Sequence, residues 1–577
     1  MQVWNYLCNN DPRKGMMSMK QISTGIEDFK TVIDNDYYYV DKTQLIADVF
    51  SNAVMLYTRP RRFGKTLNMS MLYYFFSNKE KDNDYLFESL KITENKEMMK
   101  HQNQYPVIYI TLKDMKAANI EQQVDKFRIL IQDVVNRYYV LMKSSYLNEI
   151  EKKELMKLLE KASSLGELEE ALKKVSQCLM KHYGKKAIIL IDEYDVPLQS
   201  AFIHDYYDEM TMFLGNIFSS ALKTNTSLER GVLTGCLQIA KESIFTGLNN
   251  FTVRSITSQY GGEYFGFTQN EINETLNYYN LNDKKEEMKE WYDGYLFGEK
   301  EIYNPWSSMN YILELLGNIE YPAISFWANT SGNDIVRQYI ENSTQTMKKE
   351  FELLNNGKSI IKKIVPELTY REMRFETKED MNDDIYSFLL YTGYLKIQDK
   401  VYDESGKQTA DTYKLVIPNK EVKTIYDNIF MKWFDEYQRV KRNTFINELI
   451  NGNVINAIDY LSDVLENSIS YYDNYESFYH EFMIGFLKAD GYEVKSNRES
   501  GKGRFDIALI PARKTKTCIV IECKHSFHED DLIEDSQKAA KQIERNDYLK
   551  SFESKGYRQV LGYGISFYKK QCYITKV

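Results

Sequence analysis

The sequence is poor in cysteine and has no long apolar run. Its six cysteines are scattered over 577 residues and no two form a C-x-x-C pair. This argues against a disulfide framework or a zinc site and favours a reducing compartment. The longest apolar runs, such as Ala187–Ile191, are strand-sized, far short of the roughly 20 residues that a membrane-spanning helix needs. We therefore expect a cytoplasmic protein with no membrane span.

Positive charge is also in short supply, and unevenly so. Lys and Arg number 74 against 83 Asp and Glu, a net charge of −9. The segment from Tyr471 to Val577 holds 18 of the cations and 16 of the acids, so it is nearly neutral on an acidic body. This asymmetry weakly favours an anionic partner for that end. A chain of 577 residues is too long for one hydrophobic core and predicts three or four domains.

The stretch TRPRRFGKTL, Thr58 to Leu67, resembles a phosphate-binding loop with one glycine missing. The pattern G-x-x-x-x-G-K-[ST] is met at Gly64, Lys65 and Thr66, but Arg59 stands where the first glycine belongs. An apolar strand precedes the loop and a helix follows it, which is the setting in which such loops hold phosphates. The sequence therefore predicts a nucleotide site despite the missing glycine.

The residues of this loop have separate predicted roles. We expect Gly64 to let the backbone approach the phosphates closely. Lys65 would bind the β- and γ-phosphates, and Thr66 would coordinate Mg²⁺. Arg61 and Arg62 are further cationic candidates for contacting the nucleotide.

A second nucleotide signature is an apolar strand that ends in acids, Ala187–Asp195. Because open α/β sheets bind ligands at the carboxyl ends of their strands, we expect Asp192 to hold Mg²⁺ through water and Glu193 to polarise the attacking water. Thr234, at the end of the strand Gly231–Gly235, would either sense the γ-phosphate or cap a helix.

Apolar strands at 53–57, 105–112, 187–195 and 231–235 alternate with amphipathic helices. This order predicts an α/β fold with a parallel, doubly wound sheet of the P-loop NTPase type. From about 267 to 380 the pattern is mostly helical and predicts a lid, with the aromatic turns at 291–298 and 303–309 in its core. Residues 383–397 and 413–422 predict helix, strand, turn and strand, either a winged helix or a plain hairpin bracing the lid.

Near the C-terminus, Asp506 and the triplet Glu522-Cys523-Lys524 form a candidate metal site. Antiparallel pairing of their strands would bring the two carboxylates together, and strand alternation puts Glu522 and Lys524 on one face. Carboxylates suit Mg²⁺, or Mn²⁺, and such an ion activates a bound water and stabilises charge on a phosphodiester. Lys524 would orient that water, and Glu481 on the preceding helix would add a carboxylate to the metal. The alternative is an amphipathic strand with a surface Glu–Lys pair.

The neighbourhood of these acids is basic, and a further basic turn, 512–517, separates the two strands. Basic side chains there would neutralise a phosphate backbone without reading sequence, and a solvated loop is the alternative. We expect His525 and His528 to be exposed loop residues rather than metal ligands. The basic residues around Asp506 are Lys495, Arg498, Lys502 and Arg504.

The motifs TRPRRFGKTL, IDEYD, LTG, YFGFT, WYDGYLFG and YNPWS resemble those of bacterial AAA-ATPase-like proteins that carry a C-terminal PD-(D/E)xK nuclease domain. The resemblance spans nearly the whole chain and implies P-loop nucleotide binding, with Arg59 as a family trait. The order of the C-terminal motifs resembles that of PD-(D/E)xK nucleases, a restriction-endonuclease-like α/β fold in which a helical Gln and Tyr, here Gln542 and Tyr548, shape the site. Phe505 replaces the proline of the motif's name.

The predicted order of domains is an AAA-like P-loop ATPase over 1–266, a helical lid over 267–380, a winged helix or helical connector over 381–469, and a nuclease-like domain over 470–577. The predicted function is an ATPase fused to a Mg²⁺-dependent nuclease acting on DNA and gated by the nucleotide. A rival is an ATP-driven switch or assembly protein whose C-terminal domain only binds nucleic acid, and a helicase-like motor has no further motifs to support it. A homo-oligomer is compatible with the sequence, which does not fix the oligomeric state.

Overall fold

The computed structural model describes residues 19–238, 244–245, 251–327, 345–355, 357–368, 382–403, 405–468, 476–487, 492–500 and 503–577. The chain forms two compact units, Met1–Asp427 and Asn428–Val577. The division falls within one long helix, α18 (Lys420–Asn451). The finer domain boundaries at 266, 380 and 469 stay predictions.

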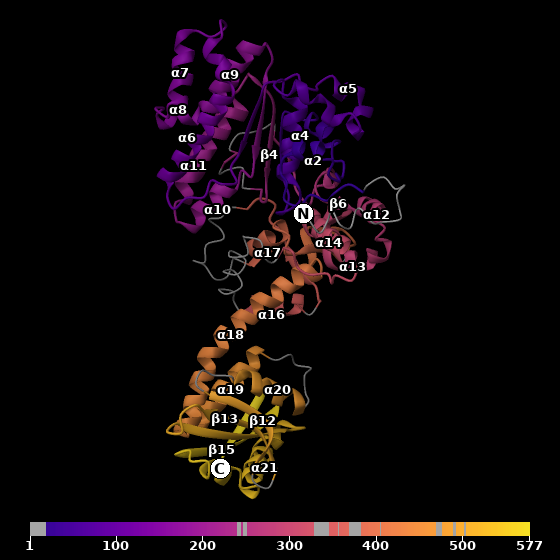
Figure 1. The fold of residues 1–577 in the computed structure, drawn as a ribbon. Helices are drawn as coiled ribbons and strands as arrows, with labels where there is room; N and C mark the ends of the chain where they lie inside the picture. Colours follow the sequence, from indigo (N-terminus) through magenta and orange to yellow (C-terminus); the bar gives the residue numbers. More distant parts are fainter. Residues whose placement is uncertain are drawn as a thin grey trace, which may run out of the picture. The chain divides into compact units, whose positions relative to one another are not determined.

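A five-stranded parallel sheet forms the centre of the first unit, with strand order β2-β3-β4-β1-β5 (Figure 1). The predicted parallel sheet is confirmed, and β5 is a fifth strand that the sequence did not reveal. It is only four residues long and half-buried along its length, so it shows no apolar run. The strands are β1 (Val54–Thr58), β2 (Val107–Thr111), β3 (Ala187–Asp192), β4 (Leu228–Gly235) and β5 (Phe251–Arg254).

Helices cover both sides of this sheet (Figure 1). α2 and α4 lie on one side, and α6 to α9 and α11 lie on the other. The helices of this part are α2 (Phe29–Asp34), α3 (Leu45–Val49), α4 (Lys65–Phe76), α5 (Lys96–Met99), α6 (Ile120–Arg137), α7 (Glu149–Leu159), α8 (Leu165–Glu169), α9 (Ala171–Tyr183), α10 (Val196–Ile203) and α11 (Tyr207–Phe218).

The region after the sheet is less helical than the sequence predicts. The aromatic turns form a small antiparallel sheet of order β6-β8-β7, because each turn contributes only three or four extended residues between helices. Its elements are β6 (Phe267–Thr268), α12 (Gln269–Tyr278), α13 (Lys285–Tyr292), β7 (Tyr295–Phe297), β8 (Lys300–Tyr303) and α14 (Pro305–Gly317).

A three-stranded antiparallel sheet, β10-β11-β9, follows. The predicted helix, strand, turn and strand are present, and β9 adds the strand that a plain hairpin lacks, so the order of elements is that of a winged helix. Residues Ile385–Tyr391 of α17 are all buried, which leaves that stretch no exposed face. The elements are α16 (Gln345–Asn355), β9 (Ile360–Lys363), α17 (Asn382–Tyr391), β10 (Lys396–Tyr402) and β11 (Gln408–Val416).

The second unit is a mixed five-stranded sheet, β12-β13-β14-β15-β16, in which only β14 and β15 are parallel. Two predictions need correction. The segment holding Lys495 and Arg498 is a strand, and the predicted helix 531–552 is two helices, broken where Asp547 adopts φ +54°. The elements are α19 (Val454–Ser468), α20 (Glu476–Phe486), β12 (Tyr492–Ser500), β13 (Gly503–Pro511), β14 (Thr517–His525), α21 (Leu532–Arg545), α22 (Tyr548–Glu553), β15 (Gln559–Tyr568) and β16 (Gln571–Lys576).

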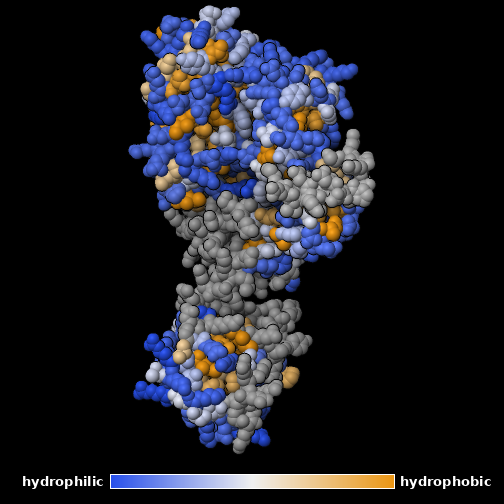
Figure 2. Space-filling view, viewed as in Figure 1, coloured by the Kyte–Doolittle hydropathy of each residue, from blue (hydrophilic) through white to orange (hydrophobic). Residues whose placement is uncertain are grey.

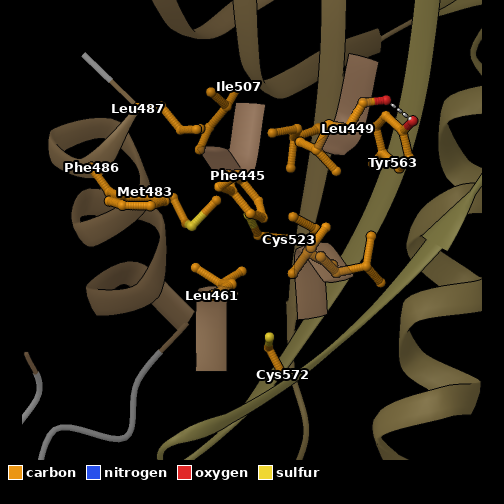
Figure 3. Packing of buried hydrophobic residues seen from close by; sticks show 14 of the residues in the cluster. Phe445, Leu449, Leu461, Met483, Phe486, Leu487, Ile507, Cys523, Tyr563 and Cys572 are labelled. Atoms are coloured by element: carbon orange, nitrogen blue, oxygen red, sulfur yellow. Dashed lines mark hydrogen bonds between the residues drawn. The ribbon is translucent and has the colours of Figure 1, made fainter. Parts of the chain in front are cut away.

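Both faces of the second sheet are covered. One face packs on α18, α19 and α20, where Phe445, Leu461 and Met483 meet Ile507 and Cys523 (Figure 3). The opposite face, through Ala508, Cys518 and Val520, packs on α21 and α22. Asp506, Glu522 and Lys524 share their strand parity with this second set, so alternation directs them toward α21.

The surface drawn in Figure 2 is mostly hydrophilic, with smaller hydrophobic patches. None of the helices in the described ranges combines the length and the apolar character that crossing a bilayer requires. The cysteines of the described part, 178, 236, 518, 523 and 572, are all buried thiols outside any disulfide.

Candidate nucleotide and metal sites

The loop between β1 and α4 has the shape of a phosphate-binding loop. Gly64 adopts φ +77° and nothing stands within 4 Å of where a Cβ would lie, so the backbone is open to a ligand at that point. The Lys65 ammonium donates to the carbonyls of Arg59 and Pro60, at 3.1 Å each. It also lies 3.3 Å from Glu193 Oε1. The lysine is therefore held over the loop by groups that a bound phosphate would replace.

Arg59 does not face the ligand. Its guanidinium is fully buried behind the loop and donates to the carbonyls of Thr58 (2.8 Å), Arg254 (2.6 Å) and Gly261 (2.9 Å). The rings of Phe265 and Phe297 lie 5.3 and 5.1 Å from it, within cation–π range. Burial lowers the pKa of Arg59 to about 10, which leaves it charged at neutral pH. The arginine thus ties the loop to the β5 end, where a glycine could form no such contacts.

Three elements converge on the carboxylate of Asp192, the last residue of β3. Thr66 Oγ1, on α4, donates to Asp192 Oδ2 at 2.8 Å. Thr234 Oγ1, on β4, donates to Asp192 Oδ1 at 2.5 Å. Burial raises the pKa of Asp192 to about 6, and the adjacent Glu193 carboxylate raises it further than burial alone would. Thr66 and Asp192, predicted from separate motifs, are brought into contact.

The acid that follows, Glu193, has φ +54°, an uncommon left-handed backbone for a residue of this kind. This conformation ends the strand and turns the side chain to the cavity, where it meets Lys65. The next acid, Asp195, was not singled out by the sequence. Its Oδ2 accepts from the amides of Cys236 (2.8 Å) and Leu237 (3.0 Å), so it braces the end of β4.

A cavity of about 400 Å³ lies against the loop and is lined by Gly64, Lys65, Thr66, Arg61 and Glu193. This volume falls within the roughly 300–1,000 Å³ of small-molecule sites. Positive side chains predominate at the loop end of the cavity, as an anionic phosphate chain requires. Arg61 also donates to Gln199 at 2.6 Å.

The other walls of the cavity come from segments that sequence reasoning did not assign to the site. Ser23–Glu27 and Trp306 of α14 line it. The guanidinium of Arg62 lies 4.2 Å from the Trp306 ring. A Cβ on Gly25, which has φ +79°, would lie 3.4 Å from that ring. The YNPWS motif contains this tryptophan, and its aromatic character was the available signal, although it predicted only lid core.

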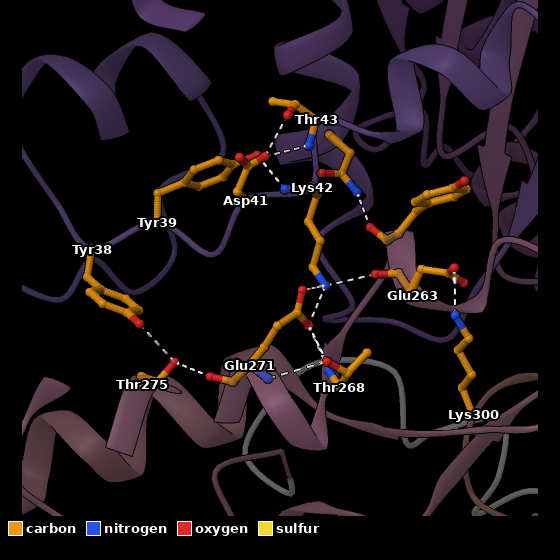
Figure 4. A network of polar contacts seen from close by, with 12 residues as sticks. Tyr38, Tyr39, Asp41, Lys42, Thr43, Glu263, Thr268, Glu271, Thr275 and Lys300 are labelled. Carbon is orange, nitrogen blue, oxygen red and sulfur yellow. Dashed lines mark hydrogen bonds and ion pairs between the residues drawn. The ribbon is translucent and has the colours of Figure 1, made fainter. Parts of the chain in front are cut away.

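A polar network joins the N-terminal segment to the lid beside this cavity (Figure 4). The buried Lys42 ammonium lies 2.7 Å from both carboxylate oxygens of Glu271 and 2.8 Å from the Glu263 carbonyl. Glu271 also accepts from the amide of Thr268 in a capping box that begins α12. Lys42 lines the cavity, so the network fixes one of its walls.

In the second unit, Asp506 and Glu522 lie together on adjacent antiparallel strands, with Ile507 opposite Ile521. The Asp506 amide donates to Glu522 Oε2 at 3.4 Å, and the Cys523 amide donates to Asp506 Oδ2 at 2.9 Å. Burial, and then the charge of Asp506, raise the pKa of Glu522 to about 8. The juxtaposition expected from the sequence is present, and the roles of these residues stay predictions.

The helix α21 approaches this pair closely. Glu522 is paired with Gly564 on β15, and a Cβ on Gly564 would stand 2.2 Å from the Ser536 carbonyl. Only glycine therefore admits α21 at this distance, and Gln542 on α21 donates to Glu522 Oε1. Tyr548 is buried on the next helix, where its hydroxyl accepts from Asn546.

The remaining predicted residues of this site are placed as follows. Lys524 is half-buried on the same strand, and its charge lowers the pKa of Glu522. His480 on α20, which the sequence did not indicate, lies 3.1 Å from the Asp506 carbonyl. His528 is exposed, as expected. His525 ends β14 and stacks on Tyr479, so its prediction as a loop residue is wrong. The side chains of Glu481, Arg498 and Arg504, and the whole of Lys502, lie outside the described residues.

The described residues fit divalent cations, although no group of three or more His, Cys, Asp or Glu gathers among them. Asp506 and Glu522 supply oxygen ligands from two strands, the type that Mg²⁺ and Mn²⁺ accept. The raised pKa of Glu522 shows that two negative charges are costly there, and a cation would relieve that cost. Thr66 and Asp192 offer a hydroxyl and a carboxylate to a metal at the loop.

Comparison with known proteins agrees with this division. Residues 23–245 match the family described as predicted AAA-ATPases, and residues 474–577 match the PD-(D/E)XK nuclease superfamily. An uncharacterized protein encoded in the vnfD 5′ region of Azotobacter chroococcum mcd 1 is 23% identical over 506 residues, covering 86% of this chain and 88% of that protein. A solved structure of a signal transduction ATPase with numerous domains and a tetratricopeptide repeat sensor, from Pyrococcus horikoshii, is 12% identical with a TM-score of 0.23. The alignment covers 82% of this chain and about half of that protein, 51%.

Proposed function

Because the chain joins a predicted AAA-ATPase domain to a PD-(D/E)XK nuclease superfamily domain, we propose that it hydrolyses ATP in its first unit and cuts nucleic acid in its second. The observation that carries this proposal is the convergence, within each unit, of acids and a lysine from separate motifs. DNA is the proposed substrate, and the cytoplasm, where the buried thiols of this chain would stay reduced, is the proposed location.

In the first unit, Lys65 and the open backbone at Gly64 would bind the phosphate chain. Thr66 and Asp192 would hold Mg²⁺, which supplies charge neutralisation between the phosphates. Glu193 would polarise the attacking water, and Thr234, which touches Asp192, would respond to the γ-phosphate. Nucleotide entry requires Lys65 to leave Glu193, so binding and release of the catalytic acid are one event.

In the second unit, Asp506 and Glu522 would hold Mg²⁺ or Mn²⁺, which lowers the pKa of a coordinated water. Glu522 must lose its proton to do so, and Lys524 favours that loss. Gln542 holds one oxygen of Glu522 and leaves the other turned toward Asp506. Lys524 would then orient the water or offset the charge that builds on the phosphodiester.

Gating of the nuclease by the nucleotide is the proposed reason for the fusion, since an unregulated nuclease endangers its own cell. The test is incubation of the full chain with plasmid, linear duplex, single-stranded DNA and RNA, with Mg²⁺ or Mn²⁺, with and without ATP. We expect metal-dependent cutting of DNA that changes with ATP in the wild type and no longer changes in Lys65→Ala. Binding of DNA with no cleavage under any condition would favour an ATP-driven switch instead.

A further inference from the structure

The basic turn between β13 and β14 is one half of a larger positive surface. Arg513, Lys514 and Lys516 belong to this turn, and the whole of Ala512–Lys516 is exposed. Lys555 and Arg558, between α22 and β15, are exposed as well. We call these five cations the basic surface. Glu553 is the only acid within either of the short segments 511–517 and 552–558.

Specific contacts hold the two segments together. The Lys514 ammonium donates to the Lys555 carbonyl at 2.6 Å, and the Arg558 amide donates to the Lys514 carbonyl at 3.0 Å. Thr517 and Gln559 join side chains at 2.8 Å as their parallel strands begin. The surface is therefore a built feature of the fold, and like charges are kept close despite their mutual repulsion.

The cations of the basic surface have no acidic partners in the described part of the chain. Other exposed lysines of this unit do: Lys538 pairs with Asp535 at 2.9 Å and Lys550 with Asp547 at 2.9 Å. An unpaired group of five cations on a chain of net charge −9 is a departure from its general pattern. Such a group leaves its positive potential available to an anionic partner.

We propose that the basic surface binds the phosphodiester backbone of the nucleic acid on which the second unit acts. This rests on the proposed nuclease function. The surface lies at the start of β14, five residues from Glu522, which is about 17 Å at the rise of a strand. A duplex advances about 3.4 Å per base pair, so contacts here would fall about five base pairs from the cut. Flexible lysines and arginines give such a surface affinity without sequence preference.

Binding of the full chain to labelled duplex DNA, single-stranded DNA and RNA, measured without divalent metal across a salt series, tests this. The variants are R513Q/K516Q and R513Q/K516Q/K555Q/R558Q. They leave Lys514, which makes the structural contact, in place. The matched control, K538Q/K550Q, removes two cations that already have acidic partners. R513K/K516R keeps the charge and should behave as wild type.

Each cation that contacts a duplex phosphate contributes about −0.9 to the slope of log K against log salt, and about −0.7 for single strands. We expect R513Q/K516Q to lower the magnitude of the slope by nearly 2 on duplex DNA, and the four-charge variant by more, while the control changes little. The polymer with the largest change identifies the substrate form. Unchanged affinity and slope for the four-charge variant on all three polymers would overturn the proposal.

Tighter binding to polyglutamate than to any nucleic acid would also overturn it, in favour of an acidic protein partner. Cleavage assays on the same variants separate this proposal from the nuclease function. If the wild type cuts nothing but the basic-surface variants still lose affinity, the nuclease function fails and the surface stands. If the wild type cuts and the variants bind equally well, the surface fails and the nuclease function stands. Thermal melts of each variant check that the fold is retained.

Discussion

The ammonium of Lys65 lies 3.3 Å from the carboxylate of Glu193 across the end of the parallel sheet. The lysine expected on the phosphates and the acid expected on the attacking water therefore neutralise each other in this structure. A bound triphosphate would compete for the lysine and set the carboxylate free to act on water. The first two predictions follow from this pair.

Replacing Lys65 with Ala should weaken ATP binding by about 100-fold, because a charge-assisted contact to the phosphates is lost. Calorimetric titration of the full chain measures it, with the exposed Lys100→Ala as the control. Unchanged affinity would show that Arg61 or Arg62 holds the phosphates instead.

Replacing Glu193 with Gln keeps the shape of the side chain and removes the carboxylate. ATP affinity should stay the same or rise, because Lys65 no longer has an ionic partner to leave. Turnover, followed by phosphate release, should fall at least about 100-fold. Normal turnover in this variant would assign the water to another group.

Replacing Arg59 with Gly restores the usual loop pattern yet should destabilise the protein. Three buried carbonyls would lose their donor, which costs at least about 2 kcal/mol. Arg59→Lys keeps the charge but cannot make the forked contacts, so it should also melt earlier than wild type. If the glycine variant melts at the wild-type temperature, the guanidinium is not the tether of this loop.

Replacing Asp506 with Ala, or Lys524 with Ala, should reduce metal-dependent cleavage at least about 100-fold and leave ATP affinity intact. The two sites belong to different compact units, so damage to one should not reach the other. Gel shifts on the same substrates should show that nucleic-acid binding survives. Cleavage by Asp506→Ala at the wild-type rate under Mg²⁺ and Mn²⁺ would place the activity elsewhere.

The raised pKa of Glu522, about 8, predicts how metal-free stability depends on pH. Between the ordinary carboxyl pKa near 4.5 and about 8, the folded protein keeps a proton that the unfolded chain releases. Stability from this group should therefore fall as pH rises through that window and level off above it. Thermal melts of wild type and Glu522→Gln, compared in EDTA, isolate this contribution.

The same proton must leave when a metal binds, so Mg²⁺ affinity should rise with pH up to about 8. Calorimetry in buffers of different ionisation enthalpy should detect close to one proton released per metal ion at neutral pH. No proton release would contradict a metal on Glu522.

Local sequence determined much of the architecture. The apolar runs gave four of the five parallel strands, and the order of strands and helices gave the α/β fold. The spacing of Asp506, Glu522 and Lys524 was enough to place them on one face, because alternation along a strand is a local property. The glycine, lysine and threonine of the loop were likewise legible from their spacing alone.

Only the tertiary structure decided what Arg59 does, since its partners at Arg254 and Gly261 are about two hundred residues away. The same holds for Trp306, which sequence placed in the lid core and folding placed beside Arg62 at the cavity. The basic surface joins segments about forty residues apart through backbone contacts. Such meetings depend on how helices and strands pack against one another, and no local period or motif carries that information.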